Sequence, residues 1–435
     1  MRRTLLRVPV FVVAAVLALT VSLSSAAGQE VVTITVDTTS NAVDFGGAQT
    51  VADLPGPDGR TTLREATIAS TNTLGPETIA FAIPTTDPGF DGSGFTILND
   101  PATDAEEWVL GDDATTIDAT TQPQPITVSG GPLEPDDDTG LLVPSSGNAV
   151  IGLGFDGYAN GLLVRGSDNT ISSCRGSGNR QAIQLSGAGI RGGNEVTGCT
   201  LSGNVIGVAV INTIGALVAG NTVGGNEHDG VFVLQSDLVD VLGNQLTGNG
   251  RSGLFHQADQ SFDELDNAAG RVEGNTITGN AANGVTVDVD RLTITDNEIV
   301  GNGSIGINLL GGREDGFGVT RNDSNDRDGR TNYPDLISAV DDGATTTLTG
   351  RIDSQVPQSL ALELYSNDAP DPSGFGEGQS LVGTATADAK GRFAVQLPTG
   401  LAGQFLTATA TAADGTTSEF SAALEVEVPR SSKKN

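Results

Sequence analysis

The sequence predicts an all-β fold dominated by a parallel β-helix, a solenoid in which each turn of the chain adds short strands to stacked sheets. A phrase such as GNTITGNAANGVTVD, at residues 274–288, recurs with changes about every 22 residues. Valine, isoleucine and threonine dominate these phrases, and glycine and asparagine interrupt them every few residues. The phrases lack the period of about 3.6 residues that marks an amphipathic helix, which argues against a leucine-rich repeat and its helical return segment.

Two columns of residues mark the corners of the predicted coils. In the aligned phrases, asparagine dominates two positions that lie five residues apart. The first column holds Phe155, Cys174, Cys199, Asn221, Asn244, Asn275, Asn297 and Asn322, and the second holds Asn160, Asn179, Asn204, Asn226, Asn249, Asn280 and Asn302. Asparagine tolerates a left-handed backbone, and amides stacked in neighbouring coils can hydrogen-bond along the column. We therefore expect these asparagines to have a structural role.

Aliphatic residues occupy fixed places between the corners. One lies three residues before each first-column position, at Ile171, Val196, Val218, Val241, Val272, Ile294 and Val319. Pairs with one residue between them follow the second column, at Val208/Val210, Val231/Val233, Val285/Val287 and Ile307/Leu309. Because side chains alternate along a strand, each pair should face the interior. The outward column is then Gln184, Ala209, Phe232, Phe255, Thr286 and Asn308.

Two departures from the columns stand out. Cys174 and Cys199, the only cysteines, share one column in successive coils. Coils stack ~4.8 Å apart, which is within the range of a disulfide, although parallel Cβ vectors would strain it. The sequence leaves two alternatives open, a disulfide in an exported protein or two buried thiols in place of asparagine. The longer step between Asn244 and Asn275 predicts a loop that bulges outward.

Residues 1–27 have the pattern of a secretory signal peptide. Arg2, Arg3 and Arg7 precede the apolar run VPVFVVAAVLALTVSL, and a cleavage site with small residues ends at Ala27. The alternative, a membrane anchor, would need a basic stop-transfer cluster after the apolar run. We therefore expect a protein that is secreted or lies at the extracellular surface, with no membrane attachment after cleavage.

Charge and composition narrow the possible partners. The chain has 22 Lys+Arg against 54 Asp+Glu, a formal net charge of −32. Such a charge repels phosphates and therefore excludes nucleic acid and anionic membrane surfaces as partners. With one tryptophan and three tyrosines, the chain has few aromatic platforms on which a sugar could stack.

The N-terminal part resembles a known family. Residues 61–71, TTLREATIAST, are the best helical candidate, because TLRE at 62–65 forms a capping box. LPGPDGRTTLREA at 54–66 and the TIAF that follows resemble the N-terminal CSLREA domain of secreted β-helix proteins. Thr61 stands where that family has cysteine, so no role of the cysteine transfers. The resemblance extends to about residue 332 and implies a right-handed β-helix of the pectin-lyase-like superfamily, without implying an activity.

The C-terminal part has a different sequence pattern from the repeats. Runs such as TTTLTGRI at 345–352 and QFLTATATAA at 404–413 alternate and are joined by turns, which predicts an immunoglobulin-like β-sandwich. ATATAADGTTSEFS also resembles the C-terminal module of the same proteins. The predicted organisation is a signal peptide at 1–27, a CSLREA-like cap at 28–76, the β-helix at 77–335, the sandwich at 336–428 and a disordered tail at 429–435.

Calcium is the one cofactor that the sequence suggests. In NDSNDRD, at 322–328, four residues offer oxygen ligands, namely Asp323, Asn325, Asp326 and Asp328. Arg327 stands where an EF-hand loop has a ligand, so the alternative is a solvated acidic turn.

The candidate functional site is the corner that follows the second asparagine column. Stacking places Arg251 one coil after His228, in the same slot, with Asp229 beside them. These three are the candidate catalytic residues. An acid, a neutral base and a cation near an aromatic pair could bind an acidic sugar or abstract a proton from it. The candidate binding residues are Glu227, Phe232, Phe255 and Arg180. The alternative is a solvated corner with an ordinary surface ion pair.

Three functions follow from these observations. The first is a secreted or cell-surface β-helix protein that binds a glycan or adheres without catalysis. The second is a polysaccharide lyase or glycoside hydrolase acting on an acidic polysaccharide near His228 and Arg251. The third is a structural component of an extracellular matrix. The outward column lacks the carboxylate pair that glycosidases use, which favours the non-catalytic functions. The expected partner is an acidic or neutral polysaccharide, and the sequence does not indicate an oligomeric state.

Overall fold

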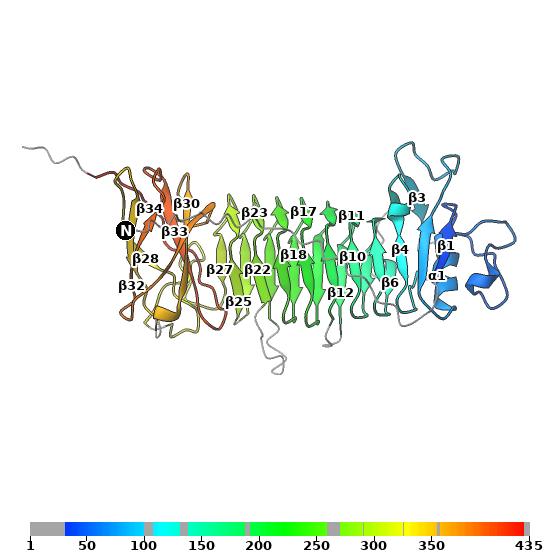
Figure 1. Ribbon diagram of the computed structural model, residues 1–435, viewed down its shortest axis with the longest axis horizontal. Helices are drawn as coiled ribbons and strands as arrows, with labels where there is room; N and C mark the ends of the chain where they lie inside the picture. Colours follow the sequence, from blue (N-terminus) through cyan, green and yellow to red (C-terminus); the bar gives the residue numbers. More distant parts are fainter. Residues whose placement is uncertain are drawn as a thin grey trace, which may run out of the picture.

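The strands stack side by side along a rod, with the N-terminal segments at one end and a smaller β-sandwich at the other (Figure 1). This computed structural model describes residues 31–99, 108–130, 138–187, 192–258, 270–289, 291–324, 326–354 and 357–429. The predicted signal peptide, most of the predicted outward loop after Gln257 and residues 430–435 lie outside these ranges.

Three parallel sheets form the rod within the described ranges. The first contains β1 (Val32–Val36), β2 (Glu77–Phe81), β4 (Thr116–Asp118), β7 (Ala149–Ile151), β10 (Thr170–Ser172), β13 (Glu195–Thr197), β16 (Leu217–Ala219), β19 (Asp240–Leu242), β22 (Gly270–Glu273) and β25 (Leu292–Thr295). The second contains β3 (Phe95–Leu98), β5 (Ile126–Ser129), β8 (Leu153–Asp156), β11 (Arg175–Ser177), β14 (Thr200–Ser202), β17 (Thr222–Gly224), β20 (Gln245–Thr247), β23 (Thr276–Thr278) and β26 (Glu298–Val300). The third contains β6 (Thr139–Val143), β9 (Asn160–Val164), β12 (Gln181–Ser186), β15 (Ile206–Ile211), β18 (Val231–Leu234), β21 (Leu254–Gln257), β24 (Val285–Asp288) and β27 (Ile307–Leu309).

The aliphatic columns form the core, as predicted. On the first sheet, Ile171 pairs with Val196, and Val196 pairs with Val218. On the third sheet, Val208 pairs with Val231, which pairs with Leu254. All of these side chains are buried. A fully buried side chain of this size contributes about 1.5–3 kcal/mol relative to exposure, and the contribution repeats in every coil. The predicted stacking of these aliphatic residues in successive coils is therefore confirmed.

The asparagine columns form hydrogen-bonded ladders, which confirms their structural role. The backbone N–H and the Nδ2 of Asn244 both donate to Oδ1 of Asn275, at 2.8 and 3.0 Å. Asn275 repeats this pattern with Oδ1 of Asn297, at 2.9 Å for both bonds. In the second column, Asn249 donates in the same way to Asn280. The corner before Asn275 needs a left-handed residue, and Gly274 supplies it with φ 66°.

The first predicted coil is out of register by two residues. Tyr158, rather than Asn160, precedes Asn179 in the second ladder, because the N–H of Tyr158 donates to Oδ1 of Asn179 at 3.0 Å. Asn160 pairs instead with Gln181, and Phe155 pairs with Gly176 inside the second sheet. The prediction is wrong here because the ladder position holds the aromatic Tyr158, whereas the repeat pattern selects the nearest asparagine, Asn160.

The last predicted member of the first column is also wrong. Asn322 lies outside the ladder, where its Nδ2 donates to the carbonyl of Tyr333 and its Oδ1 accepts the N–H of Tyr333. A third ladder, which the sequence alignment missed, passes through Asn148, Asn169 and Asn194. It begins where the N–H of Thr115 donates to Oδ1 of Asn148 at 2.8 Å.

A short helix closes the N-terminal end of the rod. Helix α1 (Leu63–Thr71) begins with the predicted capping box, because Thr62 accepts the N–H of Glu65 while Glu65 accepts the N–H of Thr62. Its residues Leu63 and Ala66 belong to the same buried cluster as the β-helix aliphatics. The 3-10 turns are η1 (Val51–Asp53), η2 (Ala119–Thr121) and η3 (Pro357–Ser359).

The C-terminal strands form the predicted antiparallel sandwich. One sheet contains β28 (Asp335–Asp341), β29 (Thr346–Arg351) and β32 (Arg392–Leu397), and the other contains β31 (Ser380–Thr386), β30 (Ala361–Asn367), β33 (Phe405–Thr411) and β34 (Leu424–Glu425). The two sheets enclose a separate core around Leu348, Leu364 and Leu406. The sandwich therefore has its own hydrophobic core.

Candidate functional site

The predicted corner is built from the turns that precede β18 and β21. The N–H of Arg251 donates to the carbonyl of His228 at 3.0 Å, so the two residues lie in successive coils. On the strands that follow, Phe232 pairs directly with Phe255. The whole outward column is in the predicted register, because Gln184 pairs with Ala209, and Thr286 pairs with Asn308. This column has no carboxylate in the described coils.

Asp229 is the buried member of the corner. Its Oδ1 accepts the N–H of Ser252 at 3.0 Å, and its Oδ2 lies 3.5 Å from Nη1 of Arg251. The side chain of Asp229 is only 2% exposed, whereas that of Arg251 is 52% exposed. Burial raises the pKa of Asp229, and the Ser252 hydrogen bond and the charges of Arg251 and His228 oppose that rise. Both carboxylate oxygens therefore hold neighbouring groups in place.

Arg251 connects this carboxylate to the aromatic pair. Its Cζ lies 5.8 Å from the ring centroid of Phe255, a cation–π contact. The rings of Phe232 and Phe255 meet edge to face, with centroids 5.8 Å apart. Both rings are partly exposed, so the guanidinium and the two rings form one accessible surface on the third sheet.

The other predicted site residues lie around this surface. His228 is partly exposed, and its imidazole makes no hydrogen bond to any residue that the structure describes. Glu227 and Arg180 are exposed. Arg180 lies two coils from His228: its carbonyl accepts the N–H of Ile206, and the carbonyl of Val205 accepts the N–H of His228.

The predicted calcium ligands form hydrogen bonds within their own turn. Asp323 accepts the N–H of Arg327, Asp326 accepts that of Asn332, and Asp328 accepts that of Arg330. Asn325 lies outside the described residues. Within the described part of the chain, no cluster of three or more His, Cys, Asp and Glu side chains is arranged to hold a metal. Calcium binding at this turn remains a prediction.

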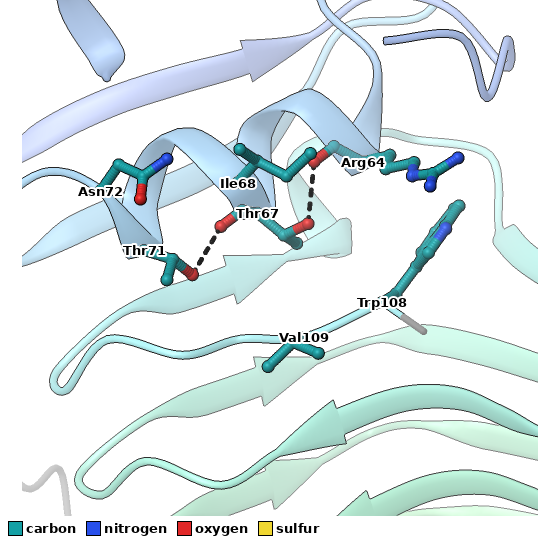
Figure 2. A pocket seen from close by; sticks show the side chains of 7 residues that line it. All are labelled: Arg64, Thr67, Ile68, Thr71, Asn72, Trp108 and Val109. Atoms are coloured by element: carbon teal, nitrogen blue, oxygen red, sulfur yellow. Dashed lines mark hydrogen bonds between the residues drawn. The ribbon is translucent and has the colours of Figure 1, made fainter. Parts of the chain in front are cut away.

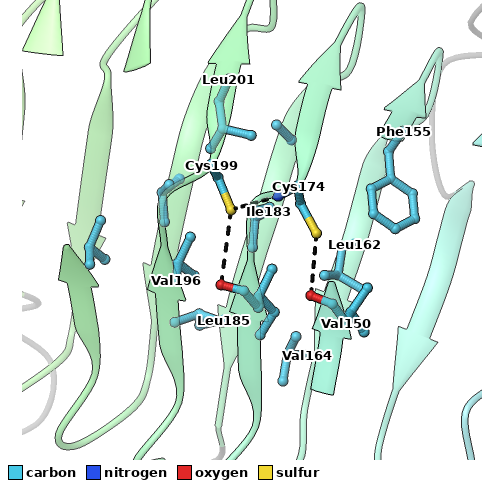
Figure 3. Close-up of a cluster of buried hydrophobic side chains, with 14 of the residues drawn as sticks. Val150, Phe155, Leu162, Val164, Cys174, Ile183, Leu185, Val196, Cys199 and Leu201 are labelled. Atoms are coloured by element: carbon cyan, nitrogen blue, oxygen red, sulfur yellow. Dashed lines mark hydrogen bonds between the residues drawn. The ribbon is translucent and has the colours of Figure 1, made fainter. Parts of the chain in front are cut away.

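The two cysteines take the place of ladder asparagines. Sγ of Cys199 accepts the N–H of Cys174 at 3.3 Å, as an asparagine Oδ1 would, and Cys199 donates its own N–H to Asn221. Both thiols are free and buried. Figure 3 shows the two Sγ atoms pointing in the same direction, away from a bridging geometry. The hydrogen bond with Cys199 and burial raise the pKa of the Cys174 thiol.

We expect neither cysteine to react with a thiol reagent in the folded protein, and both to react after unfolding without any reductant. Burial keeps a reagent away from both sulfur atoms, and the raised pKa of the Cys174 thiol also suppresses formation of its reactive thiolate. Labelling followed by intact mass measurement, in native buffer and in denaturant, checks this. Labels that appear only after reduction would reveal a disulfide instead.

A cavity of about 150 Å³ lies between α1 and the segment around Trp108 (Figure 2), lined by Arg64, Thr67, Ile68, Thr71, Asn72, Trp108 and Val109. The hydroxyl of Thr67 donates to the carbonyl of Arg64, and that of Thr71 donates to the carbonyl of Thr67. Trp108 is 2% exposed, and its Nε1 has no hydrogen-bond partner among the described residues. The repeat pattern does not indicate this cavity, because Trp108 belongs to none of the aligned phrases.

Comparison with known proteins identifies the architecture. Residues 139–324 match the family model described as right handed beta helix region. The fold is a right-handed parallel β-helix followed by an antiparallel sandwich. No curated protein matches the chain. None of the helices in the described ranges is long and apolar enough to span a membrane.

Several solved structures, including the following three, resemble parts of the chain. A mannuronan C-5 epimerase A-module from Azotobacter vinelandii is 17% identical, with 55% of this chain and 72% of that chain covered and a TM-score of 0.28. The tailspike protein of E. coli bacteriophage HK620 is 12% identical, with coverages of 77% and 80% and a TM-score of 0.30. An alginate lyase from Paenibacillus is 13% identical, with coverages of 64% and 98% and a TM-score of 0.24. At these identities and TM-scores, the likenesses support no conclusion about activity.

Proposed function

We propose that this protein is a secreted or cell-surface rod that binds polysaccharide at the Arg251/Phe232/Phe255 surface and does not transform it. The clamp on Arg251 is the observation that supports this function. The buried carboxylate of Asp229 pairs with the Arg251 guanidinium, and the ring of Phe255 packs against the same guanidinium. These contacts hold a positive charge beside the partly exposed rings of Phe232 and Phe255. Rings supply an apolar platform for the C–H face of a sugar, and the guanidinium supplies donors for its oxygens.

The buried state of Asp229 argues against a catalytic role for it. A general acid or base must come within hydrogen-bond reach of the substrate. Asp229 has a 2% exposed side chain, and both of its oxygens are engaged by protein groups. The outward column of the third sheet also contains no carboxylate in the described coils, so Asp229 has no second carboxylate there as a partner. A hydrolase with two facing carboxylates is therefore the less favoured function.

A lyase is the second candidate, because one observation favours it. The imidazole of His228 is partly exposed and lies one coil from the Arg251 guanidinium, without a hydrogen bond that would occupy it. An imidazole beside a cation could remove a proton next to a carboxylate that the cation neutralises. A protein that only binds polysaccharide releases no unsaturated product, whereas a lyase both binds the polysaccharide and releases such a product.

We expect the double variant Phe232→Ala/Phe255→Ala and the single variant Arg251→Ala to bind at least roughly tenfold more weakly, which corresponds to about 1.4 kcal/mol. Affinity electrophoresis against a panel of uronate-containing and neutral polysaccharides measures this. The matched control is Thr222→Ala/Gln245→Ala, an exposed pair from neighbouring coils of the second sheet, which should bind like the parent protein.

Two outcomes would contradict the proposal. If the aromatic double variant binds every polymer as well as the control pair does, the surface is not the binding site. If unsaturated uronate products accumulate during incubation and His228→Ala stops them, the protein is a lyase.

A further inference from the structure

The sandwich closes the open end of the β-helix by taking hydrogen bonds from all three sheet edges. The N–H of Ile294 on β25 donates to Oγ1 of Thr417 at 2.9 Å. On β26, Ile299 and Gly378 exchange backbone hydrogen bonds at 2.9 and 2.8 Å. On β27, the N–H of Leu309 donates to Oε1 of Glu419 at 2.8 Å. A last coil without such partners would leave a row of unpaired backbone groups.

At the corner, a carboxylate replaces the next asparagine of the ladder. The N–H and the Nδ2 of Asn302 both donate to Oε1 of Glu377, at 2.9 and 3.0 Å. Asn280 makes the same pair of bonds to Oδ1 of Asn302, at 3.1 and 2.9 Å. Glu377 therefore acts as one further rung, although it belongs to the sandwich. An uncharged amide serves at every earlier rung of this ladder from Asn179 to Asn302.

Two more carboxylates of the sandwich accept backbone N–H groups of the last coil and the segment after it. Both oxygens of Glu419 are used, one for Leu309 and the other for Thr320 at 2.8 Å. Glu363 accepts the N–H of Asp296 and also the hydroxyl of Tyr365, at 2.6 Å. Three carboxylates, those of Glu363, Glu377 and Glu419, thus lie in the joint between the sandwich and the last coil. An asparagine side chain would offer the same kind of acceptor oxygen without a charge.

No cation balances these carboxylates in the described part of the chain. Glu377 is 7% exposed and Glu419 is 2% exposed, and neither makes an ion pair with a described residue. The charged neighbours that act on them are acidic: Asp371 on Glu377, Glu314 on Glu419, and Asp296 and Glu273 on Glu363. Tyr333 also faces Glu419.

We propose that this joint is proton-dependent: the sandwich holds the end of the β-helix tightly while Glu363, Glu377 and Glu419 can keep protons, and loosens as they ionise together. An isolated buried charge is costly, and three uncompensated charges in one interface also repel one another. Neutral asparagine rungs inside the rod have no such dependence, so the change should be confined to this end.

The direction of the pH effect follows from the direction of the pKa shifts. Burial is the main cause that raises the pKa of all three carboxylates, to about 8 for Glu419. A carboxyl with a raised pKa in the docked state binds more protons docked than undocked. Docking is therefore strongest below the ordinary glutamate pKa near 4.5 and weakens as the pH rises through about 8.

Hydrogen–deuterium exchange of the full-length protein tests the joint, with an internal reference. The reporter amides are Asn302, Leu309 and Thr320, which donate to the carboxylates. The reference amides are Asn275 and Asn280, which donate to asparagine Oδ1. We expect the protection factors of the reporters, divided by those of the references, to fall at least roughly tenfold between about pH 5 and about pH 9.

Two variants distinguish the loss of an ionisable carboxyl group from the loss of a hydrogen bond that does not titrate. Glu419→Gln removes the ionisable group with the largest rise, so it should flatten most of the pH dependence at Leu309 and Thr320 even if docking is weaker throughout. Thr417→Val removes a non-titrating bond at the same joint, so it should lower protection equally at every pH. A flat ratio in the parent protein, or a slope that persists unchanged in Glu419→Gln, would overturn the proposal.

Discussion

Replacing Asn275 by alanine is expected to destabilise the β-helix by at least about 3 kcal/mol, because several buried polar groups would each lose a partner at about 1–3 kcal/mol. Asn275 is 1% exposed. Its Oδ1 accepts two hydrogen bonds from Asn244, and its Nδ2 donates to the carbonyl of Val241 at 2.8 Å and to Oδ1 of Asn297 at 2.9 Å. Water cannot readily reach the groups left behind.

Urea unfolding of the parent and the variants measures the change. Gln245→Ala, an exposed position on β20, is the control and should stay within about 0.5 kcal/mol. Asn275→Cys should cost less than Asn275→Ala, because Cys199 already serves as a ladder acceptor for Cys174 at 3.3 Å. If Asn275→Ala unfolds at the same urea concentration as Gln245→Ala, the ladders contribute little and the aliphatic columns alone specify the coils.

The coil architecture could be predicted from sequence because stacking repeats the same local requirement. Val241 faces the core between Val218 and Val272, and each corner asparagine binds the next one. A period of about 22 residues therefore appears directly in the sequence. The prediction failed where the requirement was met by a different residue. Tyr158 donates its backbone N–H to Asn179 without being an asparagine, and this displaced the first coil by two residues.

The sequence predicts which site residues stack in successive coils, but it does not predict where side chains point within the turn before β18. The period placed Arg251 one coil above His228 and Phe255 above Phe232, as observed. The burial of Asp229 follows instead from the turn that directs its side chain toward the N–H of Ser252. Turn geometry of this kind depends on backbone angles that a repeat pattern does not report.

The joint with the sandwich was beyond the reach of the sequence pattern for a different reason. Glu377 meets Asn302 across 75 positions of the chain, and Glu419 meets Leu309 across 110. These contacts occur once, so no period marks them. Their residue type is also misleading, because glutamate is seldom buried without a cation.

The inward column of the third sheet contains one residue that departs from its aliphatic pattern. His256 pairs with Val233 on one side and Val287 on the other, and it is 4% exposed. Its Nε2 lies 3.2 Å from the carbonyl of Ser236. Burial lowers the pKa of His256 from 6.5 to about 4, since a charged imidazole would have to remain inside the apolar core.

Replacing His256 by valine is therefore expected to remove an acid sensitivity of the fold. Because the folded-state pKa is depressed, the unfolded chain binds the proton first, and stability is lost as the pH falls from 6.5 toward about 4. The loss amounts to about 3 kcal/mol across that window. The difference in unfolding free energy between His256→Val and the parent, measured by urea at several pH values, should grow by this amount on acidification, since all other titrating groups cancel. Val287→Ala disturbs the same packing without removing a titrating group, so its difference from the parent should stay constant with pH. Parallel curves for His256→Val and the parent would mean that the imidazole accepts its proton inside the coil as readily as in the unfolded chain.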